Sequence, residues 1–175
     1  IIDDQLAAYN ATEFFITNKY KNIALITTVD YVSVGKLRTE GYLKALADYD
    51  VSINDNLIIK VEDIDHCQDQ IIDLITNNEI DAVFAVNELF AVTAIKAINK
   101  IGKKVPDDIA VIGFTDGIIS QFSTPTITTV SQNGIKMGQK AAKMLIERLE
   151  KEEDDEQYTT EIIETELIFR ESTTT

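Results

Sequence analysis

Short apolar runs alternate with longer amphipathic stretches along this chain, and no other feature of the sequence limits the possible folds as strongly. The runs are almost unbroken, as expected of strands that are buried on both faces of a sheet. We predict strands over residues 23–28, 57–61, 82–86 and 109–114. The stretches between them have the spacing of helices with one apolar side. This alternation predicts an α/β fold, a doubly wound, Rossmann-like parallel sheet with helices on both faces.

The expected helices have recognisable ends. Asp3 or Asp4 can cap the first helix, and Asp65 can cap the third. Gly102 stands where a helix-ending glycine is expected after the fourth. The predicted helices cover about 4–18, 34–49, a stretch after 65, and 88–101. The side chains expected on their buried sides are Leu6, Ala7, Ala11, Phe14, Phe15, Val34, Leu37, Gly41, Tyr42, Ala45, Leu46, Tyr49, Cys67, Ile71, Leu74, Ile75, Phe90, Ala94, Ile98 and Ile101.

The character of the sequence changes after Pro125. A short extended segment over 127–130 is followed by a predicted helix over 134–149 with one apolar stripe. The stripe consists of Met137, Ala141, Leu145 and Leu149. Residues 150–156 then hold six acids in seven positions, which predicts a solvated loop because like charges repel. A last strand is expected over 164–169, before a tail rich in serine and threonine.

Size and charge limit the possible partners. With 175 residues the chain has the size of one domain. Its net charge of −14 argues against DNA contact by this part of a protein, because DNA affinity comes mainly from Lys and Arg. Cys67 is the only cysteine, so no internal disulfide can form and a cytoplasmic location is favoured. No apolar run approaches the ~20 residues that cross a bilayer, so no membrane contact is expected. The abrupt start at Ile1 predicts a piece of a longer protein.

Sequence features that indicate an enzyme are missing. His66 is the only histidine, and on a helix its neighbour Cys67 would point about 100° away, so the two do not form a base and nucleophile. No G-x-x-x-x-G-K, G-x-G-x-x-G, nucleophile elbow or metal-binding histidine pair occurs. We therefore expect no catalytic residue, no metal and no cofactor.

The acidic pair Asp3-Asp4 invites comparison with phosphoacceptor receiver domains, which hold magnesium with such a pair. A receiver domain also needs an aspartate at the end of a later strand. The predicted strands end instead at Thr28, Val61 and Asn87. Helix capping is therefore the better interpretation of the acidic pair.

Polar residues gather where the predicted strands end, which is where doubly wound sheets bind ligands. They lie at 30–33, 63–66, 87–88 and 115–116, with Arg38 one turn into a helix. A guanidinium, an amide, carboxylates and hydroxyls together suit a polyhydroxy ligand such as a sugar. From spacing alone, however, ordinary loop and capping roles are the preferred interpretation.

Four stretches of the sequence match one family in that family's order. They are the segment from Asp3-Asp4 to Ala24, the helix from Arg38 through Gly41-Tyr42 to Leu46, the strand end at Asn87-Glu88, and residues 105–114 with the later 128–132. These stretches resemble the lactose-repressor/galactose-repressor (LacI/GalR) family of transcriptional regulators. Together they cover most of the chain. The resemblance implies a periplasmic-binding-protein-like (type I) fold and a domain that senses a small effector, a sugar or a sugar derivative.

The same resemblance implies a domain organisation. Residues 1–130 would form the effector-binding carboxyl-terminal subdomain, and 131–151 a crossover helix that belongs to the amino-terminal subdomain. Residues 152–163 would form an acidic loop, and 164–175 a return strand and tail. DNA would be bound only through a helix-turn-helix headpiece outside this chain, in a cytoplasmic homodimer. A periplasmic sugar-binding protein of a transport system is the alternative, and an enzyme is the least favoured interpretation.

The resemblance also assigns site residues. Arg38 would hold the effector and Asn87 would bond sugar hydroxyls. The family usually places an aspartate at the position of Thr115, so either Asp116 substitutes for it, or the effector differs, or binding is degenerate. We predict a ligand site at Arg38, Asn87, Thr115 and Asp116. Replacing Arg38 with alanine is expected to weaken effector binding and leave the fold intact. The stripe on helix 134–149 could pair with a second copy.

Overall fold

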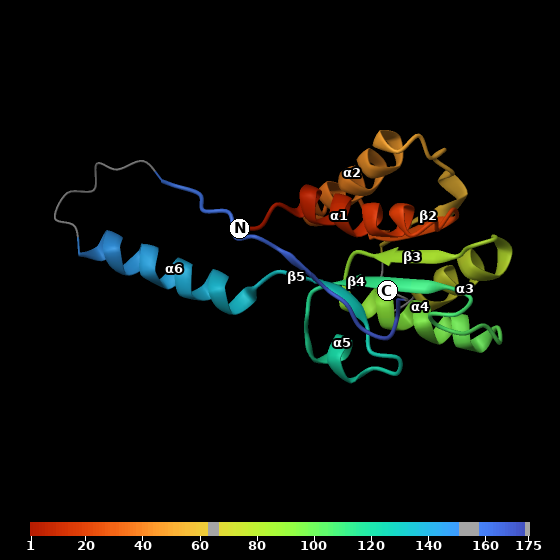
Figure 1. Cartoon of the computed structure of the whole chain (residues 1–175). Coiled ribbons are helices and arrows are strands. Elements are labelled where there is room, and N and C mark those ends of the chain that lie inside the picture. The colour runs from red at the N-terminus through yellow and green to blue at the C-terminus, as the bar shows by residue number, and fades with distance from the viewer. Residues whose placement is uncertain (63–66, 151–157, 174–175) are drawn as a thin grey trace.

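A six-stranded sheet lies at the centre of the fold, with helices packed on both of its faces (Figure 1). The computed structural model describes residues 1–62, 67–150 and 158–173. The strands are β1 (Ile23–Thr28), β2 (Ile58–Val61), β3 (Ala82–Ala85), β4 (Ala110–Phe114), β5 (Thr128–Ser131) and β6 (Glu166–Ile168). Their order is β2-β1-β3-β4-β5-β6, parallel throughout except for β6, which is antiparallel to β5. This topology confirms the predicted α/β fold.

Helices cover the sheet in pairs. They are α1 (Asp4–Thr17), α2 (Ser33–Asp48), α3 (Cys67–Asn77), α4 (Glu88–Lys100), α5 (Ile118–Phe122) and α6 (Gly134–Leu149), with a short 3-10 turn η1 (Asp55–Leu57). In Figure 1, α1 and α2 lie on one face of the sheet, and α3 and α4 lie on the other. No helix within the described ranges is both long and apolar enough to span a bilayer.

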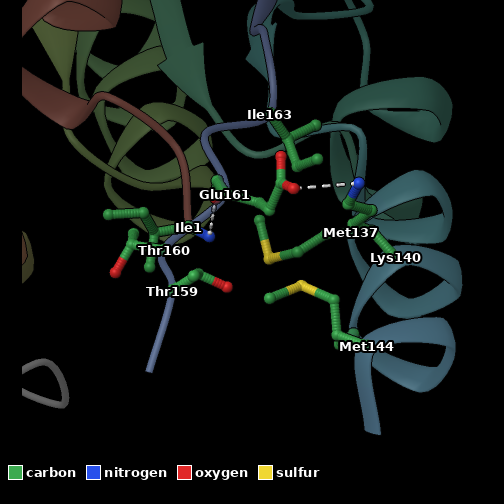
Figure 2. Close-up of a pocket in the computed structure, with 9 residues that line it drawn as sticks. Ile1, Met137, Lys140, Met144, Thr159, Thr160, Glu161 and Ile163 are labelled. Carbon is green, nitrogen blue, oxygen red and sulfur yellow. Dashed lines mark hydrogen bonds and ion pairs between the residues drawn. The ribbon is translucent and has the colours of Figure 1, made fainter. Parts of the chain in front are cut away.

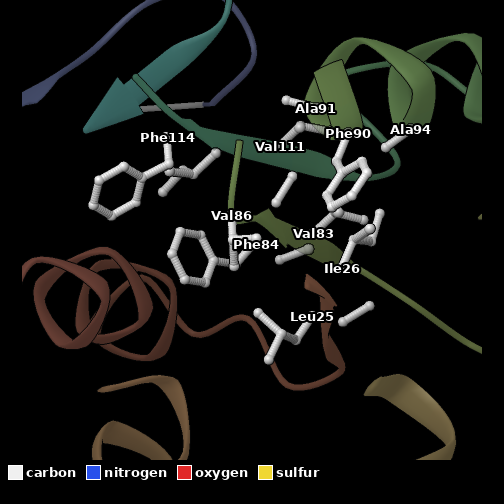
Figure 3. Close-up of a cluster of buried hydrophobic side chains, with 14 of the residues drawn as sticks. Leu25, Ile26, Val83, Phe84, Val86, Phe90, Ala91, Ala94, Val111 and Phe114 are labelled. Atoms are coloured by element: carbon white, nitrogen blue, oxygen red, sulfur yellow. The ribbon is translucent and has the colours of Figure 1, made fainter. Parts of the chain in front are cut away.

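The core is built around the two central strands. Every residue of β3 and β4 is buried, because helices cover both faces and a strand in this position has no polar side. Successive side chains along each strand point to opposite faces, so Phe84 and Val83 contribute to different layers. Figure 3 shows these side chains packed with Leu25 and Ile26 of β1 and with Phe90 of α4.

The buried sides of the helices agree with the predicted pattern except on α2 and at helix ends. The prediction was wrong for Leu6, Val34, Leu37 and Tyr49, which are 54%, 38%, 39% and 41% exposed. On α2 the residues that face inward are Gly35, Arg38, Gly41, Tyr42, Ala45 and Leu46. The helix is therefore turned so that Arg38 occupies the inner stripe and Val34 and Leu37 lie beside it. A pattern that treats arginine as a surface residue cannot predict this rotation.

Some sequence predictions fall outside the described residues. These are the cap at Asp65, the position of His66, and most of the acidic run over 150–156. The Cys67 end of α3 is described, and its predicted inner side is confirmed because Cys67, Ile71 and Leu74 are buried with Ile75.

Helix α6 differs from the other long helices because none of its residues is buried. It leaves the sheet after β5 and lies apart from the other helices (Figure 1). Backbone hydrogen bonds join the chain start to the returning segment beside it: Ile1 N donates to Glu161 O at 3.0 Å, and Ile163 N donates to Ile1 O at 2.8 Å. Asn133, just before α6, donates from Nδ2 to Glu164 O at 2.8 Å. Two chain segments, one after β5 and one before β6, thus run between the sheet and α6, and the chain start lies beside the second of them.

Candidate functional site

The carboxyl ends of the parallel strands lie along one edge of the sheet, where the loops that follow β3 and β4 are neighbours. Asn87 follows β3, and Thr115 and Asp116 follow β4. Arg38 reaches this edge from α2. Its Nη1 donates to Val86 O, directly before Asn87, and its guanidinium lies over the ring of Phe114, directly before Thr115. The structure therefore brings the predicted residues Arg38, Asn87 and Thr115 to one place.

Arg38 is almost fully buried, with only 6% of its surface exposed. Its Nε donates to Asp4 Oδ1 at 2.8 Å, Nη2 approaches the same oxygen at 2.6 Å, and Nη1 donates to Val86 O at 2.6 Å. The guanidinium carbon stands 3.4 Å from the centre of the Phe114 ring. Burial lowers the pKa of the Arg38 guanidinium, and the neighbouring Asp4 carboxylate opposes that shift. The bonds to Asp4 and Val86, with the Phe114 ring beneath, fix the guanidinium in one orientation.

These contacts change two predictions made from the sequence. Of the acidic pair, only Asp3 caps α1, since its Oδ1 accepts from Leu6 N at 2.9 Å. Asp4 instead pairs with Arg38, a role that no local pattern indicated. Replacing Arg38 with alanine would leave the Asp4 carboxylate and the Val86 carbonyl without their partner. We therefore no longer expect that variant to leave the fold intact.

Asn87 caps α4 from the end of β3. Its Oδ1 accepts from Phe90 N at 2.8 Å, which satisfies one of the free amides of the first helical turn. Because the amide oxygen is used in this way, the Nδ2 group is the part of Asn87 that can serve a ligand. The residue is half-buried and therefore accessible at this edge. Its capping role and its predicted ligand role use different atoms.

Thr115 has an unusual backbone conformation. Its φ is +83°, in the left-handed region that β-branched residues rarely occupy. Tertiary bonds hold it there: Thr115 N donates to Val130 O at 2.9 Å, and Thr115 O accepts from Thr129 Oγ1 at 2.9 Å. Strain of this kind persists where the surrounding structure enforces it, often at binding sites.

Asp116 forms an ion pair with Arg170, near the carboxyl end of the chain. Its Oδ1 accepts from Arg170 Nη2 at 2.5 Å, and Arg170 Nη1 also donates to Ile127 O at 2.8 Å. Both side chains of the pair are less than one-fifth exposed. The pair ties the loop after β4 to the segment after β6, so at least one carboxylate oxygen of Asp116 is committed inside the protein.

Glu88 is a further residue at this edge that the sequence predictions did not single out as a ligand or support residue. Its Oε1 accepts from Ser120 N in α5 at 2.7 Å, which links the loops after β3 and β4. Gly117 makes room for this contact, because a Cβ there would stand 2.5 Å from Glu88 Oε2. In the sequence, Glu88 could have been noticed because it adjoins Asn87 at a strand end. Only the fold shows that Glu88 lies against Gly117 and Ser120.

Other parts of the predicted rim are more scattered. Asp30, after β1, pairs with Lys60 of β2 at 2.7 Å, with both side chains substantially exposed. Residues 63–66 lie outside the described part of the chain.

A cavity of about 180 Å³ lies elsewhere, between α6 and the returning segment (Figure 2). None of the predicted site residues lines it. Its lining residues are Ile1, Met137, Lys140, Ala141, Met144, Thr159, Thr160, Glu161 and Ile163. Figure 2 shows Met137 and Met144 on the α6 side, with Lys140 paired to Glu161 across the seam at 3.0 Å. Its lining mixes apolar side chains with Lys140, Glu161 and two threonines, and it is separate from the strand-end site.

Comparison with known proteins agrees with this architecture. A family model described as a periplasmic binding protein-like domain matches residues 12–173. The chain belongs to this family. The match spans every strand of the sheet, so the periplasmic-binding-protein-like fold includes β6 as well as the parallel strands.

Relatives of this periplasmic-binding-protein-like domain are transcriptional regulators. The HTH-type transcriptional repressor PurR of Haemophilus influenzae (strain PittEE) is 32% identical over 180 residues, which cover 98% of this chain and 53% of that protein. The NTD biosynthesis operon regulator NtdR of Bacillus subtilis (strain 168) is 36% identical over 177 residues, with 98% and 52% covered. The chain spans about half the length of the curated relatives it matches.

A solved structure supports the same relationship. A sugar-binding transcriptional regulator of the LacI family from Escherichia coli, complexed with phosphate, superposes with a TM-score of 0.85 at 26% identity. The superposition covers 98% of this chain and 61% of that one. The resemblance to the LacI/GalR family inferred from the four sequence stretches is thereby confirmed.

Proposed function

We propose that this chain is the effector-sensing part of a DNA-binding transcriptional regulator, and that it binds a small molecule, a sugar or a sugar derivative, at the carboxyl edge of the sheet. The observation that carries the proposal is the convergence of Arg38, Asn87 and Thr115 at that edge, in a chain whose relatives are regulators. Asp116 follows Thr115 in the same loop, and its bond with Arg170 holds that loop in place. The function is binding rather than catalysis.

The domain organisation inferred from the sequence is part of this proposal. Residues 1–130 form the effector-binding subdomain, and 131–151 cross to an amino-terminal subdomain that lies outside this chain. Residues 152–163 form the loop and 164–175 the return. The absence of buried residues on α6 supports this, because an amphipathic helix gains most of its stability from a partner face. A headpiece beyond this chain makes the DNA contact in a cytoplasmic homodimer.

Signalling in this proposal is a shift between two arrangements of the subdomains. An effector can change the population only if it binds one arrangement more tightly than the other. The two segments that join the sheet to α6, with the chain start beside them, are the place about which the subdomains would move. A change in their relative angle would alter the spacing of the two headpieces in the dimer.

The test uses the full-length protein and the DNA upstream of its own gene. Footprinting should show a protected site, and one compound from a set of sugars, sugar acids and sugar phosphates should change the protection. A protein that binds no DNA site, or whose binding ignores every small molecule in the set, would contradict the proposal. A secretory leader on the gene would point instead to an exported binding protein.

A further inference from the structure

The guanidinium of Arg170 bonds to both ends of the loop that joins β4 to β5. Its Nη2 donates to Asp116 Oδ1 at 2.5 Å near the start of this loop, and its Nη1 donates to Ile127 O at 2.8 Å at the end. The loop spans residues 115–127 and contains α5. The Arg170 side chain is only 17% exposed, so solvent ions screen the pair weakly. Because a planar guanidinium holds its N–H groups in a fixed fork, Arg170 keeps the two loop ends at a set separation.

The loop that Arg170 closes carries Thr115, whose φ of +83° lies in the left-handed region. Ser120 joins the same two ends from inside the loop. Its Oγ donates to Thr115 O at 3.3 Å, and its backbone O accepts from Ile127 N at 2.8 Å. A strained conformation persists only where surrounding bonds enforce it. We therefore expect Thr115 to keep its position at the strand-end site only while the loop stays closed.

The backbone of Arg170 belongs to the segment that returns from α6 to the sheet. The far end of this segment bonds to the crossover region, since Glu161 pairs with Lys140 of α6 at 3.0 Å. Close by, Glu164 O accepts from Asn133 Nδ2 at 2.8 Å. The near end consists of β6, which pairs with β5, and then Arg170. One short stretch of chain therefore contacts α6 at one end and the loop after β4 at the other.

The other two residues of the site are held in a different way. Arg38 bonds to Asp4 of α1 and to Val86 at the end of β3, and Asn87 caps α4. In the part of the chain that the structure describes, neither side chain bonds to the returning residues 158–173. The loop after β4 is thus the part of the site that a movement of the returning segment would reach directly.

We propose that Arg170 couples the strand-end site to the crossover helix α6. It is a positioning residue, because it acts through Asp116 and the loop rather than on the ligand. When the subdomains change their arrangement, the returning segment moves with α6, and the two Arg170 bonds pass that movement to the loop that carries Thr115. An effector that binds the closed loop more tightly then favours one arrangement. This inference rests on the proposed function and adds the residue through which the site regulates DNA binding.

The experiment measures the DNA affinity of the full-length protein with and without a saturating small molecule. The probes are D-ribose, D-glucose, D-glucuronate and D-glucose 6-phosphate. The ratio of the two affinities is the coupling factor, which is typically about 5- to 150-fold in allosteric proteins. Arg170→Met removes both bonds to the loop, so it should reduce the coupling factor by about fivefold or more. Saturation with the probe separates this loss from a change in probe affinity.

Two further variants separate coupling from stability. Arg170→Lys keeps the charge but can reach only one of the two acceptors, so its coupling factor should lie between those of Arg170→Met and the parent. Ser172→Ala is the matched control in the same segment. Ser172 Oγ donates to Val111 O at 2.6 Å and accepts from Thr128 N at 2.8 Å, with no side-chain bond to the loop. It should lose thermal stability and keep the parent's coupling factor. Arg170→Lys carries the test if Arg170→Met does not fold.

Each result bears on one of the two proposals. If both Arg170 variants keep the parent's coupling factor, the coupling role is overturned and the sensor function stands. Equal losses in Ser172→Ala and Arg170→Lys also overturn it, because general loosening of the segment would then explain the response. If none of the probes changes the DNA affinity of the parent protein, the proposed function is contradicted, and the coupling role fails with it.

Discussion

The sheet body, here β1 to β5 with α1 to α4, contrasts with the crossover region, here α6 and residues 158–165. Both contain amphipathic sequences with similar spacing. In the sheet body the apolar sides are buried, whereas α6 leaves Leu145 and Leu149 58% and 76% exposed. The contrast shows that helical spacing specifies a face but not its partner. Helices in proteins are stabilised mainly by tertiary packing, so α6 is expected to add little to the stability of this chain alone.

The largest difference between the regions should come from the same truncation made in each. Ile112→Ala removes a fully buried side chain from β4 and should lower the free energy of unfolding by about 2–5 kcal/mol, from lost burial and the cavity left behind. Ile146→Ala on α6, where the side chain is 54% exposed, should change it by less than about 0.5 kcal/mol. Urea unfolding of the 175-residue chain measures both. Comparable losses in the two variants would mean that α6 packs far more tightly than the contrast implies.

Ion pairs provide a second comparison. Arg38→Ala breaks a buried pair and leaves Asp4 uncompensated, so it should cost about 3 kcal/mol or more. Lys140→Ala breaks the Lys140–Glu161 pair of the crossover region, whose side chains are 40% and 49% exposed, and should cost under about 1 kcal/mol. Thermal unfolding of both variants distinguishes them. A small effect of Arg38→Ala would show that the buried pair is not a structural requirement of the site.

Thr115, the residue of the sheet-body loop with positive φ, should become less strained when a residue that tolerates this φ replaces it. Thr115→Asn places a residue that tolerates positive φ where threonine does not, and should stabilise the fold by up to about 1 kcal/mol. Thr159→Asn, in the exposed returning segment, is the control and should have almost no effect. The midpoints of chemical denaturation report the change. Destabilisation by Thr115→Asn would mean that the threonine side chain is needed in place despite the strain.

The smallest expected effect concerns pH, at the point where the returning chain meets the sheet body. Glu171 Oε2 accepts from Thr126 N at 2.8 Å and from Thr126 Oγ1 at 2.9 Å, and these bonds lower the pKa of the Glu171 carboxyl. Its stabilising contribution is therefore complete above the unfolded pKa of about 4.3 and is lost as the pH falls through the lower folded pKa.

Glu171→Gln should thus reduce the difference in stability between pH 6 and pH 3. Urea midpoints of the two proteins across that range measure it. An acid dependence that is the same with and without the Glu171 carboxyl would contradict the assignment.

The sequence predicted most of the fold because its strands are buried on both faces. Such strands must be continuous apolar runs, and the run at 82–86 corresponds to β3 within one residue. The helix over 134–149 was also predicted with its observed bounds, since glycine and an apolar stripe mark it. The rotation of α2 was missed because its inner stripe contains Arg38, and local patterns assign arginine to the surface.

The sequence by itself determined the succession of strands and helices along the chain and the family to which the domain belongs. Burial periodicity and short motifs are local properties of the chain, so no tertiary structure was needed for either. The sequence also indicated Arg38, Asn87 and Thr115 as neighbours at a strand-end site. Only the tertiary structure decided what each group has left for a ligand. The pairs of Arg38 with Asp4, of Glu88 with Ser120 and of Asp116 with Arg170 join residues 34, 32 and 54 positions apart. A charged side chain that looks available in the sequence can therefore be bonded inside the fold. The chemistry of the site follows from the atoms that have no such internal partner.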